Sequence, residues 1–174
     1  WNALKGMGES AMPALDKLFR SDAAPYLRAR ALWLLLKSDN PQAYFKAAAH
    51  DRDANINIIA IRAARQGNMS SAPLYDLATR PNPQILREIA LALHHEKSPH
   101  VPTLWAKLAQ KYPDNDRWYL EALGIGADGQ WEACLAAWQK AGGNIQTEAG
   151  KDIIWRARCA SACPLLGELA TDKS

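Results

Sequence analysis

Apolar residues in this chain recur with a long and nearly constant period. An alanine followed by a large aliphatic residue stands in the same register four times, at separations of 29, 30 and 32 residues: Ala31-Leu32, Ala60-Ile61, Ala90-Leu91 and Ala122-Leu123. A period of this length is typical of repeat proteins, in which each repeat is one supersecondary unit. We therefore expect the four alanines to be buried where helices approach closely. We expect the four aliphatic residues to form a continuous core.

Each period divides into two amphipathic segments. The second carries apolar residues at helical spacing, as in the stripe Leu27, Ala31, Leu32, Leu34 and Leu35. The first opens near a proline, which suits the start of a helix because its missing N–H needs no partner there: Pro13, Pro41, Pro73, Pro102 and Pro164. Polar residues just before these prolines are predicted helix caps: Ser10, Asn40, Ser71 and Ser161.

Short polar turns separate the two segments. Clusters of Asp, Asn, Ser and Pro at 21–23, 51–53, 80–83 and 113–116 are predicted to end one helix and cap the next. Glycines are predicted to mark places where the chain leaves a helix: Gly67, Gly124, Gly126, Gly142 and Gly143. The predicted helices span 1–6, 10–20, 24–37, 41–49, 53–66, 71–79, 83–95, 100–111, 116–125, 130–141, 149–159 and 162–171.

These elements predict an all-α fold, an α-α superhelix of antiparallel helix pairs with about five to six repeats. One helix pair cannot bury its apolar stripe alone, so stacked pairs supply the missing surface. We expect a single repeat domain over residues 1–174, wound right-handed, with first helices on the convex side and second helices on the concave side. The chain begins with Trp1 inside a repeat, which indicates a piece excised from a longer multidomain protein.

Composition narrows the class of function. Apolar residues make up 48% and charged residues 22%, which indicates a globular chain. The net charge of +3 does not call for a nucleic acid or an anionic membrane as partner. No apolar run approaches the roughly 20 residues of a membrane span.

The residue types that usually serve in catalysis or metal binding do not stand at suitable spacings in this sequence. Cys134, Cys159 and Cys163 have no framework spacing and are expected to behave as small buried apolar residues. His94, His95 and His100 lack a carboxylate or cysteine at ligand spacing, and a surface position is expected. No nucleophile has a base beside it, so we predict no catalytic residue, no cofactor and no metal.

A basic stripe is the main candidate for binding. Arginines lie in or beside the second helices: Arg28, Arg30, Arg62, Arg65, Arg87, Arg117, Arg156 and Arg158. They indicate either a concave surface for an anionic partner or structural links to turn residues such as Asp22 and to nearby carbonyls. Trp131 and Trp138 share a helix face and are expected to be buried, whereas Trp118 is the tryptophan expected to be exposed. The predicted partner-binding residues are Arg28, Arg62, Arg87 and Trp118.

The repeat pattern resembles a known family. A hairpin of about 30 residues with proline early in its first helix and Arg-x-x-Ala-Leu in its second is similar to short HEAT-like repeats. The order of segments 28–35, 86–93, 116–127 and 153–158 resembles the helical region of secreted bacterial dehydrogenase and cytochrome c proteins of planctomycete, verrucomicrobial and Bacteroidetes type. The most specific run is Asp116-Arg117-Trp118-Tyr119-Leu120-Glu121-Ala122-Leu123-Gly124-Ile125-Gly126.

The resemblance implies a role and a location. In such proteins a sugar-dehydrogenase-like propeller precedes the helical region and a cytochrome c domain often follows it. We therefore expect a non-catalytic scaffold or protein-interaction module that contacts other domains of the same chain or a partner protein, in the periplasm or outside the cell. The alternatives are a cofactor-cradling or lyase-like HEAT protein and a HEAT-like DNA glycosylase, for which the net charge is low. The parent protein is itself a candidate dehydrogenase.

Overall fold

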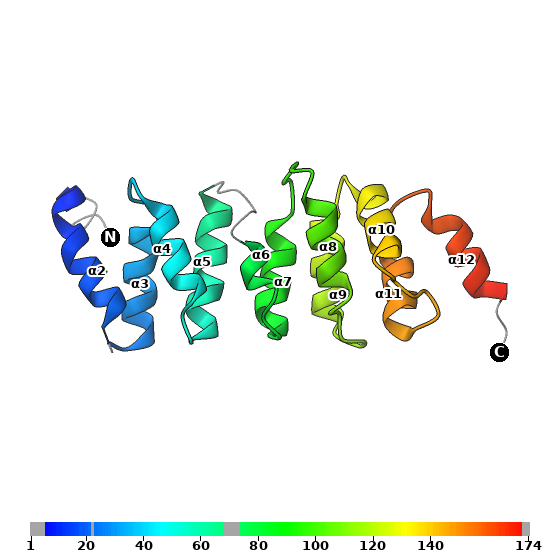
Figure 1. The fold of residues 1–174 in the computed structure, drawn as a ribbon, viewed down its shortest axis with the longest axis horizontal. Coiled ribbons are helices and arrows are strands. Elements are labelled where there is room, and N and C mark those ends of the chain that lie inside the picture. Colours follow the sequence, from blue (N-terminus) through cyan, green and yellow to red (C-terminus); the bar gives the residue numbers. More distant parts are fainter. Residues whose placement is uncertain (1–5, 22, 68–73, 172–174) are drawn as a thin grey trace. The chain divides into compact units, whose positions relative to one another are not determined.

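The computed structural model describes residues 6–21, 23–67 and 74–171 (Figure 1). The regular secondary structure of these residues is entirely helical. The predicted all-α class is confirmed. The chain divides into two compact units, residues 1–77 and 78–174, and each is described by itself. The single domain, the superhelix and the number of repeats stay predictions.

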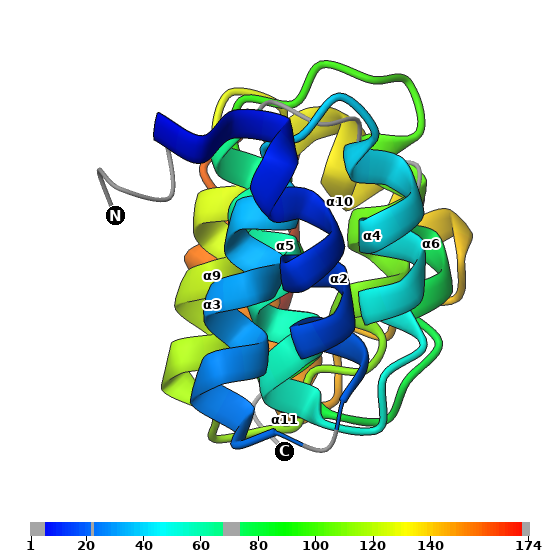
Figure 2. The same ribbon diagram turned by 90° about the vertical axis from the view of Figure 1, so that its left-hand side faces the viewer.

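The described residues of the first unit form one 3₁₀ turn and five α-helices. They are η1 (Gly8–Ala11), α2 (Met12–Arg20), α3 (Pro25–Leu35), α4 (Pro41–Ala49), α5 (Ala54–Gln66) and α6 (Leu74–Leu77). Helix α3 packs against α2, α4 and α5, and Figure 2 shows α3 on one side of this unit and α4 on the other. The predicted helix at 1–6 and the start of the one at 71–79 lie outside the described residues.

In the second unit, the part that the structure describes forms six α-helices. They are α7 (Pro83–Ala92), α8 (Val101–Ala109), α9 (Arg117–Gly126), α10 (Trp131–Lys140), α11 (Glu148–Arg156) and α12 (Ala162–Thr171). The second helices α7, α9 and α11 pack in sequence, and the first helices α8 and α10 pack against each other. Two layers result, and the α7–α9–α11 layer carries the candidate site. Helix α7 ends earlier than predicted, shortly before His95 adopts a positive φ of 66°.

Side-chain caps hold the starts of the second helices. Asp53, Asn82 and Asp116 each accept a hydrogen bond from a backbone N–H in the following turn, and Thr147 does the same for α11. The prediction that the polar turns cap the second helices is therefore confirmed for α5, α7 and α9, but α3 begins after Ala24 with no side-chain cap. The caps predicted at Ser10 and Asn40 are wrong because neither side chain caps the start of its helix.

The alanine register marks the core as predicted. Ala31, Ala60, Ala90 and Ala122 are all at most 2% exposed. Of the aliphatic partners, Leu32, Ile61 and Leu123 are buried, but Leu91 is half-exposed. The prediction for Leu91 is wrong because it shares a helical stripe with Gln84 and Arg87, while Ile89 and Leu93 fill the core.

The position three residues before Ala31, Ala60 and Ala122 has a common structural use. Arg28 Nε donates to the carbonyl of Phe19 at 2.9 Å, and Asn57 Nδ2 donates to the carbonyl of Ala48 at 2.6 Å. The Tyr119 hydroxyl donates to Leu108 O at 3.0 Å. Each acceptor is the penultimate residue of the preceding first helix. The repeated donor therefore pairs a helix-terminal carbonyl that has no partner within its own helix.

Tryptophans pack the core of the second unit. Trp105 of α8 donates through its indole nitrogen to Leu123 O at 2.9 Å and makes an edge-to-face contact with Trp131 of α10. Trp131 and Trp138 are buried, as predicted. Of the cysteines only Cys134 is buried, so the prediction of three buried thiols is wrong for Cys159 and Cys163. No described helix is long and apolar enough to cross a membrane.

Candidate functional site

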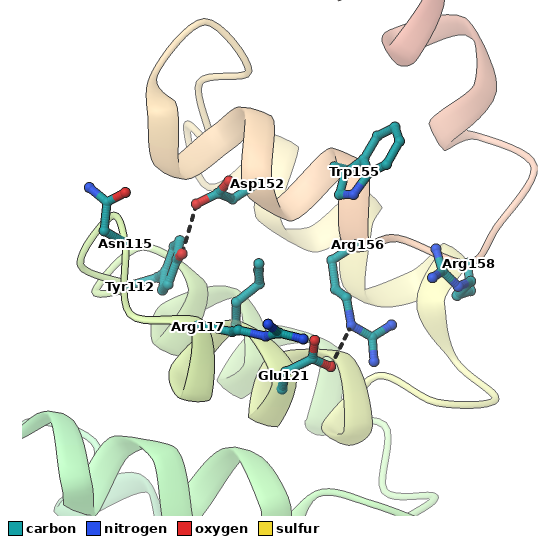
Figure 3. Close-up of a pocket in the computed structure, with 9 residues that line it drawn as sticks. Tyr112, Asn115, Arg117, Glu121, Asp152, Trp155, Arg156 and Arg158 are labelled. Carbon is teal, nitrogen blue, oxygen red and sulfur yellow. Dashed lines mark hydrogen bonds and ion pairs between the residues drawn. The ribbon is translucent and has the colours of Figure 1, made fainter.

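An open groove of about 670 Å³ lies between α9 and α11 in the second unit (Figure 3). The loop before α9 and Arg158, which follows α11, complete its walls. Its lining is polar and rich in cations and includes one large aromatic plane: Tyr112, Asn115, Arg117, Leu120, Glu121, Asp152, Trp155, Arg156 and Arg158.

Local structure places these side chains. The Asp116 cap fixes the start of α9, and Arg117 and Glu121 then lie one turn apart on one helix face. On α11, Asp152, Trp155 and Arg156 repeat the same spacing. Ala157 is extended, with φ −60° and ψ 145°, so the helix stops there and Arg158 lies on the segment that follows.

An ion pair crosses the groove from helix to helix. Arg156 Nε lies 3.1 Å from Glu121 Oε2, and both side chains are partly exposed. The guanidinium rests against the backbone at Gly124, where an added Cβ would lie 2.4 Å from Arg156 Cζ. Gly124 therefore leaves room for the arginine, and its place inside α9 corrects the prediction that it marks a helix end.

A hydrogen bond closes the other end of the groove. The Tyr112 hydroxyl donates to Asp152 Oδ2 at 2.8 Å, as Figure 3 shows. Burial, the hydrogen bond and the charge of Asp152 raise the pKa of Tyr112 above its ordinary value. The phenol therefore stays protonated at neutral pH and occupies one carboxylate oxygen of Asp152.

The groove carries an unbalanced positive charge. Three arginines face two carboxylates, and each carboxylate already has a partner within the groove. Within the described part of the chain, neither Arg117 nor Arg158 makes an ion pair; Arg158 donates to the carbonyl of its neighbour Ala157 at 3.3 Å. These two guanidinium groups therefore remain available to an anionic ligand.

Exposed tryptophans accompany these charges. Trp155 lines the groove and is 75% exposed, and Trp118, next to Arg117 on α9, is 73% exposed. The exposure predicted for Trp118 is confirmed. Ile125, two turns along α9 from Trp118, is 40% exposed. Large apolar side chains are rarely this exposed in neighbouring elements unless another surface covers them.

The four residues predicted to bind a partner fall in two units. Arg28 and Arg62 belong to the first, and Arg87 and Trp118 to the second. Arg28 is half-buried and pairs with Asp51, which agrees with the structural alternative. Arg62 is exposed on α5, and Arg87 is half-buried on α7. As a binding set, the four residues stay a prediction.

The sequence predicted only some of the other groove residues. The predicted basic stripe included Arg117, Arg156 and Arg158, but no feature separated them from the arginines that build the fold. Tyr112 and Asp152 are 40 residues apart and carry no motif, so sequence reasoning missed their contact. The only local signal is a tryptophan beside an arginine on each helix.

Arg28 also lines a groove of about 620 Å³ in the first unit, together with His50, Asp51 and Arg52 at the helix ends. In the described part of the first unit, Tyr26 on α3 is a large exposed aromatic residue, and its ring lies 5.8 Å from Arg30 Cζ. Among the described residues no group of three His, Cys, Asp or Glu side chains could hold a metal.

Comparisons with protein families, with curated proteins and with solved structures found no match.

Proposed function

We propose that this chain is a non-catalytic helical-repeat module that binds a protein partner through the α7–α9–α11 layer of its second unit. The observation that carries the proposal is a pair of exposed tryptophans on the two helices of an arginine-rich groove: Trp155 lines the groove, and Trp118 lies on α9. Tryptophan and arginine are the residues most enriched where protein interfaces gain their free energy.

The groove favours binding over catalysis. Its carboxylates are held by Arg156 and by Tyr112, so neither is arranged as a free general base. No cysteine, serine or histidine lines it. A partner would cover the two indoles and the guanidinium groups together, which removes apolar surface from water while keeping the charges paired.

A displayed peptide library tests the proposal. The immobilised chain is used to select peptides, and binding of each selected peptide is then measured with the wild type, Trp118→Ala and Trp155→Ala. We expect each tryptophan variant to weaken binding by about 2 kcal/mol or more. The matched control is Tyr26→Ala, an aromatic that is 61% exposed on the first unit, which should bind as the wild type does.

Two results would contradict the proposal. One is a set of selected peptides that bind the tryptophan variants as tightly as the wild type. The other is a saturable rise in melting temperature with haem, zinc or short duplex DNA, since a ligand that binds the native state stabilises it by mass action. A DNA effect that fades steeply with salt would favour the glycosylase-like alternative.

The resemblance supports a narrower proposal about context. According to this narrower proposal, the module contacts a sugar-dehydrogenase-like propeller and a cytochrome c domain of one secreted bacterial protein, in the periplasm or outside the cell. The test is titration of this chain with those two domains produced separately. Binding that Trp155→Ala abolishes would support the proposal, and absence of binding to both domains would refute it.

A further inference from the structure

We infer that the α9–α11 groove recognises an acidic peptide segment in which carboxylates flank an aromatic or large apolar residue. This inference rests on the proposed function and names the partner's chemistry. Arg117 and Arg158 would pair with the carboxylates, and Trp155 would cover the apolar residue between them.

The charge argument comes first. Glu121 and Asp152 are already paired within the groove, and the two outer guanidinium groups are not. A bound carboxylate therefore meets two available donors, while a bound cation meets carboxylates that must first give up their partners. Guanidinium–carboxylate pairs are charge-assisted and frequently bidentate, so they fix the register of the segment as well.

The internal pair fixes the position of the third arginine. Arg156 is held by Glu121 and seated against Gly124, so it forms a fixed part of the groove wall. Arg117 and Arg158 come from different elements on the two sides of this pair (Figure 3). Two donors on opposite sides suit an extended segment with separated carboxylates better than a single compact anion.

The aromatic plane selects against a purely charged ligand. The Trp155 side chain lines the groove with most of its surface in water, and Trp118 stands on the neighbouring helix. Covering an indole of this size contributes a large apolar term that an all-acidic segment cannot use. The segment is therefore expected to carry an aromatic or aliphatic residue between its carboxylates.

A nucleic acid fits the groove less well. Two carboxylates line the same wall as the arginines, and the chain's net charge is only +3. Binding to a phosphate backbone draws on many cationic contacts along a continuous surface. A peptide also brings backbone N–H groups, which suit the second oxygens of Glu121 and Asp152 and the side chain of Asn115.

The experiment measures fluorescence anisotropy of a labelled peptide, Gly-Asp-Glu-Phe-Asp-Glu-Gly, with the whole chain. The comparison peptide has Asn and Gln in place of Asp and Glu. The protein variants are Arg117→Gln with Arg158→Gln, and Lys140→Gln as the control, since Lys140 is an exposed cation on α10 outside the groove. Circular dichroism and melting temperature verify that each variant is folded.

We expect the acidic peptide to bind at least about tenfold more tightly than the neutral one, and the double arginine variant to lose about tenfold in affinity. The Lys140→Gln control should change affinity less than about twofold. Equal binding of the two peptides, or equal losses in the arginine and lysine variants, would overturn the inference. Tighter binding of polygalacturonate or duplex DNA than of the peptide would also overturn it.

The library selection separates this inference from the proposed function. The selected peptides could depend on Trp155 and yet carry no carboxylates and bind the arginine variants as tightly as the wild type. That result would support the protein-binding role and refute the acidic class of ligand. If no selected peptide depends on the tryptophans, both the proposed function and this inference are refuted.

Discussion

Gly126 lies where α9 crosses close to α7, and replacing it with alanine tests that contact. A Cβ added at Gly126 would lie 2.3 Å from the carbonyl oxygen of Ala90 and 3.6 Å from Leu93 Cβ. Ordinary contact requires the first distance to grow by roughly 1 Å. Because the obstacle is helix backbone, α7 and α9 must separate, and overpacking of this kind typically costs about 1–3 kcal/mol.

Gly124 supplies a matched control in the same helix. There the added Cβ meets the guanidinium of Arg156, a flexible group that can move away at the cost of the Glu121 ion pair. That pair is partly exposed and contributes about 1 kcal/mol or less. Alanine in place of glycine in a helix interior gains about 1 kcal/mol, and Gly126, as the last residue of α9, receives only part of that gain. We therefore expect Gly124→Ala to be nearly neutral and Gly126→Ala to lose about 0.5–2.5 kcal/mol.

Urea unfolding of the whole chain measures the difference. Tryptophan fluorescence reports mainly on the second unit because five of the seven tryptophans lie in residues 78–174. Circular dichroism at the same urea concentrations shows whether both probes follow one transition. If Gly126→Ala is as stable as Gly124→Ala, the close approach of α7 and α9 is not the constraint that the geometry implies.

Three further predictions concern buried polar groups. Tyr119→Phe keeps the ring but removes the side-chain donor to Leu108 O, which still accepts from Lys111 N at 3.0 Å. Urea unfolding should therefore show a loss of about 0.5–1.5 kcal/mol, and no loss would contradict the role. Burial, with a smaller contribution from Cys159, raises the pKa of Cys134 to about 12, whereas an unfolded cysteine ionises near pH 8.5. The unfolded chain therefore loses a proton that the native state keeps, and stability should fall between about pH 8.5 and 12, less steeply in Cys134→Ala. A thiol reagent at pH 8 should label exposed Cys163 while Cys134 reacts only on unfolding, and equal labelling rates would contradict its burial.

The helices could be predicted closely because their signals are local. Helix α4 and helix α12 span the predicted ranges 41–49 and 162–171, and the described ends of the others differ by no more than three residues. Apolar periodicity, prolines at helix starts and Asp or Asn caps each act within a few residues of chain. Leu91 was misassigned because the repeat register fixes the face only approximately, and a small rotation of α7 moves a side chain from core to surface.

The glycines show where local signals were insufficient. Gly124 and Gly126 look like helix-end residues in the sequence. Gly126 is indeed the last residue of α9, but Gly124 lies inside the helix, and both are buried. What they permit is a close approach by residues distant in sequence, the carbonyl of Ala90 and the guanidinium of Arg156. A glycine at such a contact does not alter the periodic pattern of apolar residues. Its role can therefore be recognised only from the packed helices.

The candidate groove was hard to predict for a related reason. Residues that recur in register can make equivalent contacts, and Arg28, Asn57 and Tyr119 each donate to a terminal carbonyl of the preceding helix. Periodicity therefore reports how repeats hold together. The groove instead depends on residues that break the register, such as Arg158, which follows the extended Ala157. We therefore expect binding residues at positions that depart from the sequence register, and the comparison of the Arg117 and Arg158 double variant with Lys140→Gln tests that expectation directly.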